Sequence, residues 1–143
     1  MRSIFERASS FNQPLNSWDV SGVTEMSKMF KGASSFNQPL ISWNTSNVTS
    51  MREMFRDNSA FDQDISSWDI TSCVNLLIFM LGANGFSVAN YDALLVGWES
   101  QLVNNDISVN FGGSQYTASS AAATARQALI DDHNWTIIDG GTA

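Results

Sequence analysis

FERASSFNQPLNSWDVSGVTEMSKM, residues 5–29, is followed directly by FKGASSFNQPLISWNTSNVTSMREM, residues 30–54. Sixteen of the 25 aligned positions are identical, so the two stretches are tandem copies. A third, more divergent copy covers residues 55–79, and a fourth begins with MLGANGF at Met80. A repeat of this length is typical of chains whose copies stack on one another and share a continuous core.

The apolar residues recur at fixed places in each copy and predict both the core and the local structure. Val23, Met26, Met29 and Phe30 have the spacing of one helical face, so we expect a short helix in this half of the copy. Thr24 would be its N-cap and Gly32 its C-terminal stop. The other half is extended, because a proline disfavours helix at the residue before it. We therefore expect three stacked parallel strands, at residues 15–18, 40–43 and 65–68.

The C-terminal third has longer helical patterns separated by short alternating stretches. We expect helices near residues 90–102 and 117–132, the second beginning at an N-cap on Thr117. Strands are expected at Asp106–Phe111 and Trp135–Asp139, each closed by a Gly-Gly pair. The expected fold is a single domain, residues 1–143, of the α/β repeat solenoid class. Residues 1–80 would hold three repeats and a partial first coil, and residues 81–143 two capping coils.

The charge of the chain is unevenly distributed. Residues 1–56 carry six basic and four acidic groups, whereas residues 57–143 carry Arg126 alone against ten acids. Such a balance argues against nucleic acid as a partner, because nucleic acids need clustered Lys and Arg. No apolar run is long enough to cross a membrane, and Cys73 has no second cysteine with which to form a disulfide. We expect Cys73 to be a small buried hydrophobe.

Phe11, Asn12, Gln13, Pro14, Leu15 and Trp18, followed by the VTxM and MF motifs, carry a resemblance to known proteins. This stretch of sequence resembles the BspA-like leucine-rich-repeat surface proteins of bacteria, in their 25-residue subtype. The resemblance is close over residues 1–70 and looser afterwards. It implies a leucine-rich-repeat-like solenoid, an extracellular or cell-surface location, and a role in interaction or adhesion. It implies no catalytic residues.

Met1 and Ile4 occupy the places of Met26 and Met29, so the chain starts within a repeat. We expect any export signal and any earlier copies to lie upstream. The first coil would then present apolar side chains without a neighbour, which favours association. We therefore expect a homodimer through this end of the molecule.

The residues that could support chemistry form no recognisable site. His133 is the single histidine and lacks the nucleophile motif of a Ser-His-Asp triad. Asp57, Asp62, Asp64 and Asp69 make the third copy acidic, but the glycine and the closing glutamate of a calcium loop are missing. Weak calcium binding stays open as an alternative. We expect no enzyme activity, no metal site and no cofactor.

Positions that differ between the copies are the best candidates for recognition. We select Asn16, Ile41 and Ser66, which occupy one place in successive copies, together with Asp62 and Asp64 of the acidic third copy. The expected function is a non-enzymatic scaffold for protein–protein interaction or adhesion. The alternative is glycan binding through exposed aromatic and amide side chains. Exposure of Trp18, Trp43 and Trp68 would distinguish the two.

Overall fold

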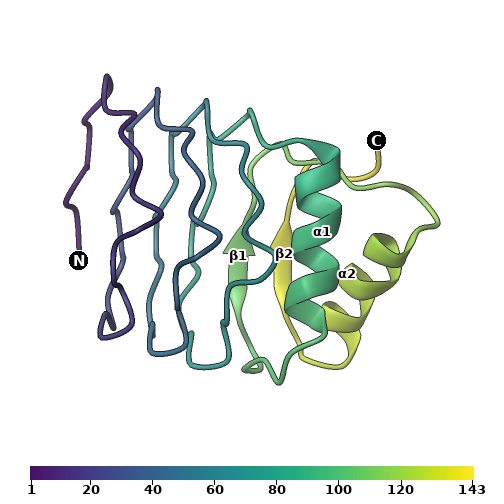
Figure 1. Cartoon of the computed structure of the whole chain (residues 1–143). Helices are drawn as coiled ribbons and strands as arrows, with labels where there is room; N and C mark the ends of the chain where they lie inside the picture. The colour runs from purple at the N-terminus through teal and green to yellow at the C-terminus, as the bar shows by residue number, and fades with distance from the viewer.

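Regular secondary structure is confined to the C-terminal part of the chain, and residues 1–86 are built from successive turns (Figure 1). The computed structural model describes all residues, 1–143. Helix α1 spans Val88–Glu99 and helix α2 spans Ala121–Asp131. Strands β1, Ser108–Asn110, and β2, Thr136–Ile138, pair in parallel with Ser108 opposite Thr136. These two strands confirm the ones expected at 106–111 and 135–139, with shorter bounds.

The expected α/β solenoid of the leucine-rich-repeat kind is wrong. None of the 25-residue copies contains a strand followed by a helix, and only single bridges link Glu25 to Ser50 and Ser50 to Asn75. The helix expected around Val23–Phe30 does not form, so Thr24 is no N-cap. The structure instead has two helices and a two-stranded sheet, all after residue 87.

Backbone conformation explains why the short helices are absent. Lys28, Glu53 and Ile78, which are 25 residues apart, all have φ near +60° (60°, 56° and 60°). Four residues later, Gly32 and its equivalents have positive φ as well, 58° at Asp57 and 79° at Gly82. A residue in the left-handed region cannot continue a right-handed helix. The helical spacing of the apolar residues was therefore misleading.

These alternating conformations direct backbone groups sideways, toward the next copy. We call residues 26–32, 51–57 and 76–82 the pairing segments, with residues 1–7 in the same place before the first copy. In the first pairing segment every second N–H donates to a carbonyl 24 residues later. The bonds are Met26 to Ser50, Lys28 to Arg52 and Phe30 to Met54, all 2.9 Å, and Gly32 to Arg56, 2.8 Å. Backbone groups that a helix would satisfy internally are thus satisfied between copies.

The strands expected at 15–18, 40–43 and 65–68 are also wrong. Each stretch is a turn, closed by a bond of the Trp18, Trp43 or Trp68 amide to the carbonyl three residues earlier. In a strand, Leu15 and Trp18 would point to opposite faces. The turn instead lets Leu40 and Trp43, and likewise Ile65 and Trp68, both enter the core.

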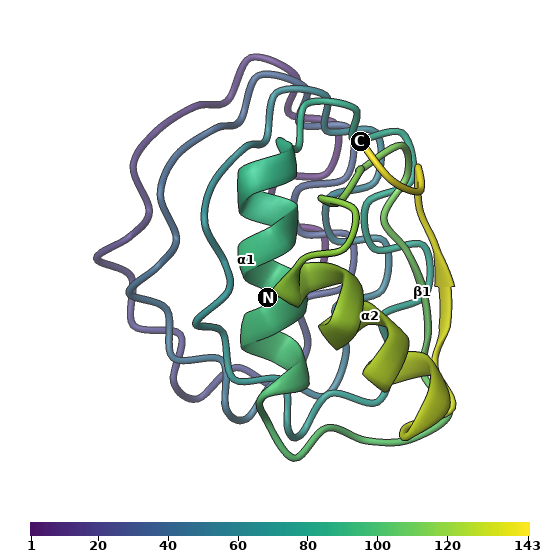
Figure 2. The same cartoon turned by 90° about the vertical axis from the view of Figure 1, so that its right-hand side faces the viewer.

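The two helices are shorter than the ranges 90–102 and 117–132 that the pattern predicted. Ser87 is the N-cap of α1, and the helix stops at Glu99, before Gln101, whose side chain bonds the Trp68 carbonyl. The N-cap of α2 is Ser120. Thr117 is held outside that helix because its amide and hydroxyl bond Asp92. Figure 2 shows both helices at the C-terminal end, with α2 lying in front of α1.

One core runs through the whole molecule. It contains the recurring Phe, Met and Leu side chains of the copies and continues into Tyr91, Leu94 and Trp98 of α1. Cys73 is buried in it beside the residues of the third copy, as its position predicted. A continuous core of this kind lets each segment bury its apolar face against the next one.

Candidate functional site

The tryptophans of the repeat hold the copies together. The indole Nε1 of Trp43 donates to the Leu15 carbonyl at 2.9 Å, and that of Trp68 donates to the Leu40 carbonyl at 3.1 Å. The exposed fraction is 4% for Trp43, 0% for Trp68 and 39% for Trp18. Two of the three rings are therefore too deeply buried to contact a ligand. This burial argues against glycan binding by a row of exposed tryptophans.

The Asn12, Asn37 and Asp62 side chains form a second ladder between copies. The Asn12 Oδ1 accepts from the Asn37 amide at 2.9 Å, and the Asn37 Oδ1 accepts from the Asp62 amide at 2.9 Å. The amide side chains of Gln38 and Gln63 donate to the same two oxygens. These residues satisfy backbone groups at the corner of each copy.

Asp62 ends this ladder at the start of α1. Its Oδ1 accepts from the Ser87 amide at 2.9 Å, from the Ser87 hydroxyl at 2.7 Å and from the Asn90 side chain at 2.7 Å. Burial alone would raise the pKa of Asp62, but these hydrogen bonds outweigh it and the pKa is lowered. Asp62 therefore acts as an extra cap on α1, where a negative charge is favoured by the helix dipole.

The other acidic candidate, Asp64, lies on the surface two residues away. It accepts a hydrogen bond of 2.9 Å from the Ser66 amide and thereby shapes the turn before Trp68. The four aspartates of the third copy do not converge. Nowhere in the chain do three His, Cys, Asp or Glu side chains gather in the arrangement of a metal site.

The three repeat-variable candidates lie on the side of the molecule that leads to α1. Asn16 is engaged with its neighbour, because its side chain bonds both the amide and the hydroxyl of Ser42. Ile41 is 49% exposed, a large fraction for an apolar side chain. Ser66 lies under α1: its carbonyl is 2.4 Å from where a Cβ on Gly97 would stand. Only a glycine permits the helix to approach the third copy so closely.

Ser66 also lines a groove beside the helices. The groove has a volume of about 490 Å³ and lies between α1 and the start of α2. Apart from Asp92, the residues that line it have small side chains. They include Ala93 and Val96 of α1, and Ala121 and Ala122 of α2. The structure thus brings one sequence-selected residue, Ser66, to a mostly apolar surface depression that the sequence did not predict.

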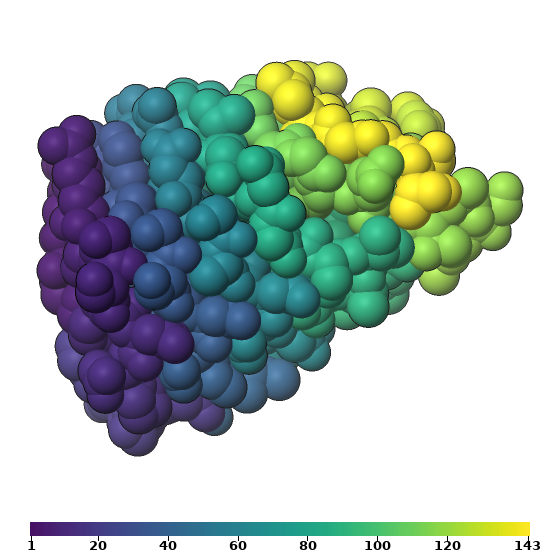
Figure 3. Space-filling model, turned by 90° about the horizontal axis from the view of Figure 1, so that it is seen from above, coloured from purple at the N-terminus to yellow at the C-terminus, as the bar shows by residue number.

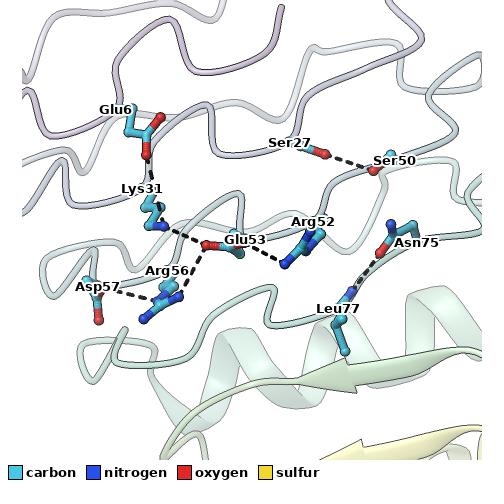
Figure 4. Close-up of polar contacts among 10 residues, drawn as sticks. All are labelled: Glu6, Ser27, Lys31, Ser50, Arg52, Glu53, Arg56, Asp57, Asn75 and Leu77. Carbon is cyan, nitrogen blue, oxygen red and sulfur yellow. Dashed lines mark hydrogen bonds and ion pairs between the residues drawn. The ribbon is translucent and has the colours of Figure 1, made fainter.

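A charge cluster around Glu53 lies among the pairing segments (Figure 4). The buried Glu53 carboxylate is 2.6 Å from Lys31 Nζ, 3.1 Å from Arg52 and 3.2 Å from Arg56. The Lys31 hydrogen bond, together with the neighbouring positive charges, lowers the pKa of Glu53 against the effect of burial. Three basic side chains are therefore arranged around one carboxylate, and much of their charge is compensated locally.

Sequence reasoning missed this cluster and two other buried polar groups. Asn58 is fully buried, and neither its Nδ2 nor its Oδ1 has a hydrogen-bond partner. Near the C-terminus, Asp139 accepts from the Tyr91 hydroxyl and from Arg126, both at 2.7 Å. A signal for Asn58 was present, since Ala33 and Ala83 occupy the same place in the other copies.

Cys73 is the single cysteine of the chain, and His133 is its single histidine. Burial raises the pKa of the Cys73 thiol to about 11, so the thiol is protonated at neutral pH and a poor nucleophile. The His133 ring Nδ1 lies 3.1 Å from the Asn105 Oδ1, in an exposed hydrogen bond.

Residues 1–94 match the model of a family described as Mycoplasma protein of unknown function, DUF285. The chain belongs to the DUF285 family. No curated protein and no solved structure matches it. No helix has the length and apolar character required to span a bilayer.

The DUF285 match ends at Leu94, within α1. The matched part contains the tryptophan and amide ladders, the Glu53 cluster and the contact of Asp62 with α1. Strand β1, helix α2 and strand β2 lie beyond it. The matched residues therefore include those that hold the copies together and the Asp62 side chain that contacts the start of α1.

Proposed function

We propose that this DUF285 protein is a non-enzymatic scaffold that binds a protein partner through side chains that differ between its copies. The observation that carries the proposal is the difference in burial between recurring and variable side chains. The recurring Trp43 and Trp68 are buried in contacts between copies, whereas Ile41, at a place where the copies differ, is 49% exposed. Recurring residues build the molecule, and Ile41 is a variable residue that is available to a partner.

The chemistry of the exposed side favours a protein over a sugar. Ile41 offers apolar area, Ser66 adds a hydroxyl, and the groove beside Ser66 is lined mainly by alanine, valine and glycine. Apolar area surrounded by polar groups is typical of protein interfaces. The proposed location is the cell surface or the extracellular medium. It is supported by the resemblance of the FNQPL…SW motif to BspA-like surface proteins.

Glycan binding is the alternative function, and Trp18 is the observation in its favour. This ring is 39% exposed, so it could stack on a sugar, whereas Trp43 and Trp68 could not. A single partly exposed ring is a small platform. Binding through it would be abolished by Trp18→Ala and unaffected by changes at Ile41.

The two functions are separated by binding the purified chain to arrays of extracellular proteins and of glycans. We expect binding to a protein, and we expect Ile41→Glu to weaken it. Val74→Glu is the matched control, because Val74 is also an exposed aliphatic residue but lies next to Asn75, which bridges to Ser50. Binding to glycans alone, or protein binding that Ile41→Glu leaves intact, would overturn the proposal.

A further inference from the structure

One asparagine of the chain differs from all the others in its surroundings. The chain has thirteen asparagines, and eleven of them form hydrogen bonds through their side chains. Asn58 has no partner but is fully buried. Asn84 is exposed, and its side chain makes no hydrogen bond within the molecule. Its carboxamide is therefore the only one that is both unbonded and open to water.

The residue after Asn84 is Gly85, and no other asparagine of the chain is followed by a glycine. A glycine lacks the side chain that would shield the neighbouring carboxamide from the backbone. The earlier copies have Ser10, Ser35 and Ala60 at this place. The fourth corner thus combines an exposed carboxamide with an unshielded backbone nitrogen.

Packing against the third copy is the reason that residue 85 has no side chain. A Cβ on Gly85 would stand 2.3 Å from the carbonyl oxygen of Ser59. Figure 3 shows the copies side by side as successive bands of colour, so each copy lies against the one before it. The close approach that joins the fourth corner to the third copy therefore also leaves Asn84 unshielded.

The backbone of this corner is less tied by hydrogen bonds than that of the second copy. The amides of Ser35 and Phe36 donate to backbone carbonyls at 3.1 and 2.9 Å. The equivalent amides of Gly85 and Phe86 donate to no acceptor. The Gly85 nitrogen is therefore free to approach the Asn84 side chain.

We propose that Asn84 is a site of spontaneous modification, at which its carboxamide is converted to an acid. The Gly85 backbone nitrogen attacks the Asn84 Cγ, so that an N–Cγ bond forms and the bond from Cγ to Nδ2 breaks. Nδ2 takes up the proton of the attacking nitrogen and leaves as ammonia. The product is a cyclic imide of the Asn84 side chain and the backbone. This chemistry does not depend on the partner proposed above.

Water opens the imide in two directions. Cleavage of the bond between Cγ and the Gly85 nitrogen gives aspartate at position 84 and leaves the backbone unchanged. Cleavage at the other ring carbonyl gives isoaspartate, in which the backbone runs through the side chain and is longer by a methylene group. Both products add a negative charge to an exposed corner, which alters local electrostatics as other charge-changing modifications do.

The longer backbone of isoaspartate has a structural consequence, because this corner links the pairing segment 76–82 to α1. Phe86 stacks on Phe61 with ring centroids 6.3 Å apart, and Ser87 is the N-cap of α1. Gly85 already has no space for an added carbon. Aspartate should fit at the corner, whereas isoaspartate should displace these residues and lower the melting temperature.

Incubation of the whole chain at mildly alkaline pH, followed by peptide mapping with mass spectrometry, tests the proposal. We expect Asn84 to be converted, and more slowly at mildly acidic pH, because the attacking nitrogen must lose its proton. Asn16 and Asn58 are internal controls. Both precede a serine, but Asn16 bonds Ser42 and Asn58 is buried. These two should be converted only in a chain unfolded with guanidinium chloride, whereas Asn84 should be converted in both states.

Two variants separate the modification from its consequence. Asn84→Ser introduces the residue that the second copy has at Ser34, and it should abolish the release of ammonia at this corner. Asn84→Asp reproduces the charge without the longer backbone, so its melting temperature should be close to that of the wild type. The isoaspartate form, separated by chromatography, should melt at a lower temperature than Asn84→Asp.

The two parts of the proposal are overturned by different results. A folded chain in which Asn84 stays intact, or in which Asn16 is converted as fast as Asn84, would rule out the modification site. An isoaspartate form as stable as Asn84→Asp would rule out the effect on the attachment of α1.

Discussion

The indole Nε1 of Trp68 donates a hydrogen bond of 3.1 Å to the carbonyl of Leu40, which lies in the preceding copy. The bond is buried, and the ring itself has no exposed surface. The tryptophan therefore has two roles, because it fills the core of its own copy and satisfies a backbone group of its neighbour. A residue of this kind makes the stability of one copy depend on the next.

Replacing Trp68 by phenylalanine should separate these roles. We expect Trp68→Phe to lower the free energy of unfolding by about 2 kcal/mol, because the Leu40 carbonyl loses its donor and the core loses ring volume. Urea unfolding followed by circular dichroism measures the change. Trp18→Phe is the control and should have a much smaller effect, since its Nε1 has no partner within the chain. Equal losses for the two variants would contradict this account.

Asn58 is expected to be a site where a substitution stabilises the protein. Its amide is fully buried with both polar atoms unpaired, and an unsatisfied buried polar group costs about 1–3 kcal/mol. Ala33 and Ala83 already occupy the same place in other copies. We expect Asn58→Ala to raise the melting temperature. Asn47→Ala should lower it slightly, because Asn47 donates to the Ser21 carbonyl. A loss of stability in Asn58→Ala would show that the amide has a partner.

Asp62 should make the stability of the molecule depend on pH. Its pKa is lowered from the ordinary 3.8, so its charged form is favoured in the folded state. The resulting stabilisation is present above pH 3.8 and is lost as the pH falls through the lower, folded-state pKa. We expect Asp62→Asn to cost about 1 kcal/mol at neutral pH, because an amide lacks the charge that the α1 dipole favours.

Chemical unfolding of the wild type and Asp62→Asn at several pH values tests this. The difference between the two proteins should shrink once the pH is well below 3.8. Asp64→Asn is the control, since Asp64 bonds the Ser66 amide and does not face α1. A difference between wild type and Asp62→Asn that is constant with pH would rule out a charge effect.

Replacing a glycine by alanine usually stabilises a helix, but we expect Gly97→Ala to lower the stability of the protein. In the interior of an exposed helix, alanine is about 1 kcal/mol more favourable than glycine. In α1, however, a Cβ at this place would stand 2.4 Å from the Ser66 carbonyl oxygen. We expect Gly97→Ala to destabilise the protein by about 2 kcal/mol or more, because backbone must move to relieve the overlap. Gly22→Ala, where no atom lies within 4 Å, should be close to neutral in the same thermal unfolding experiment.

The sequence allowed the places of the core residues and of the C-terminal strands to be predicted. The recurrence of Phe30 and Phe55, and of Trp43 and Trp68, identified side chains that are buried. The alternation in Asp106–Phe111 identified β1, which pairs in parallel with β2. Both inferences rest on patterns of burial, and such patterns are visible in a single sequence.

Backbone conformation within the copies was not predictable in the same way. Lys28, Glu53 and Ile78 share a positive φ, yet none of them is a glycine, so no residue type signalled the break in the helix. The apolar spacing then favoured a helix that does not exist. The groove at Ser66 depends on the packing of α1 against α2, and its position does not follow from either helix alone.

The amide ladder has a consequence for how such a chain can grow. Asn12 and Asn37 have side chains that can both donate and accept, so an asparagine at this corner can serve one unit after another without accumulating charge. A carboxylate can only accept, and a column of carboxylates would repel itself. Asp62 makes the same bond as the two asparagines, since its Oδ1 accepts from the amide of Ser87, which lies 25 residues later at the next corner. Ser87 is also the N-cap of α1, so this charged corner is the one from which a helix starts. A carboxylate is thus used at the corner where a helix dipole favours its charge, and neutral amides are used at the two corners before it.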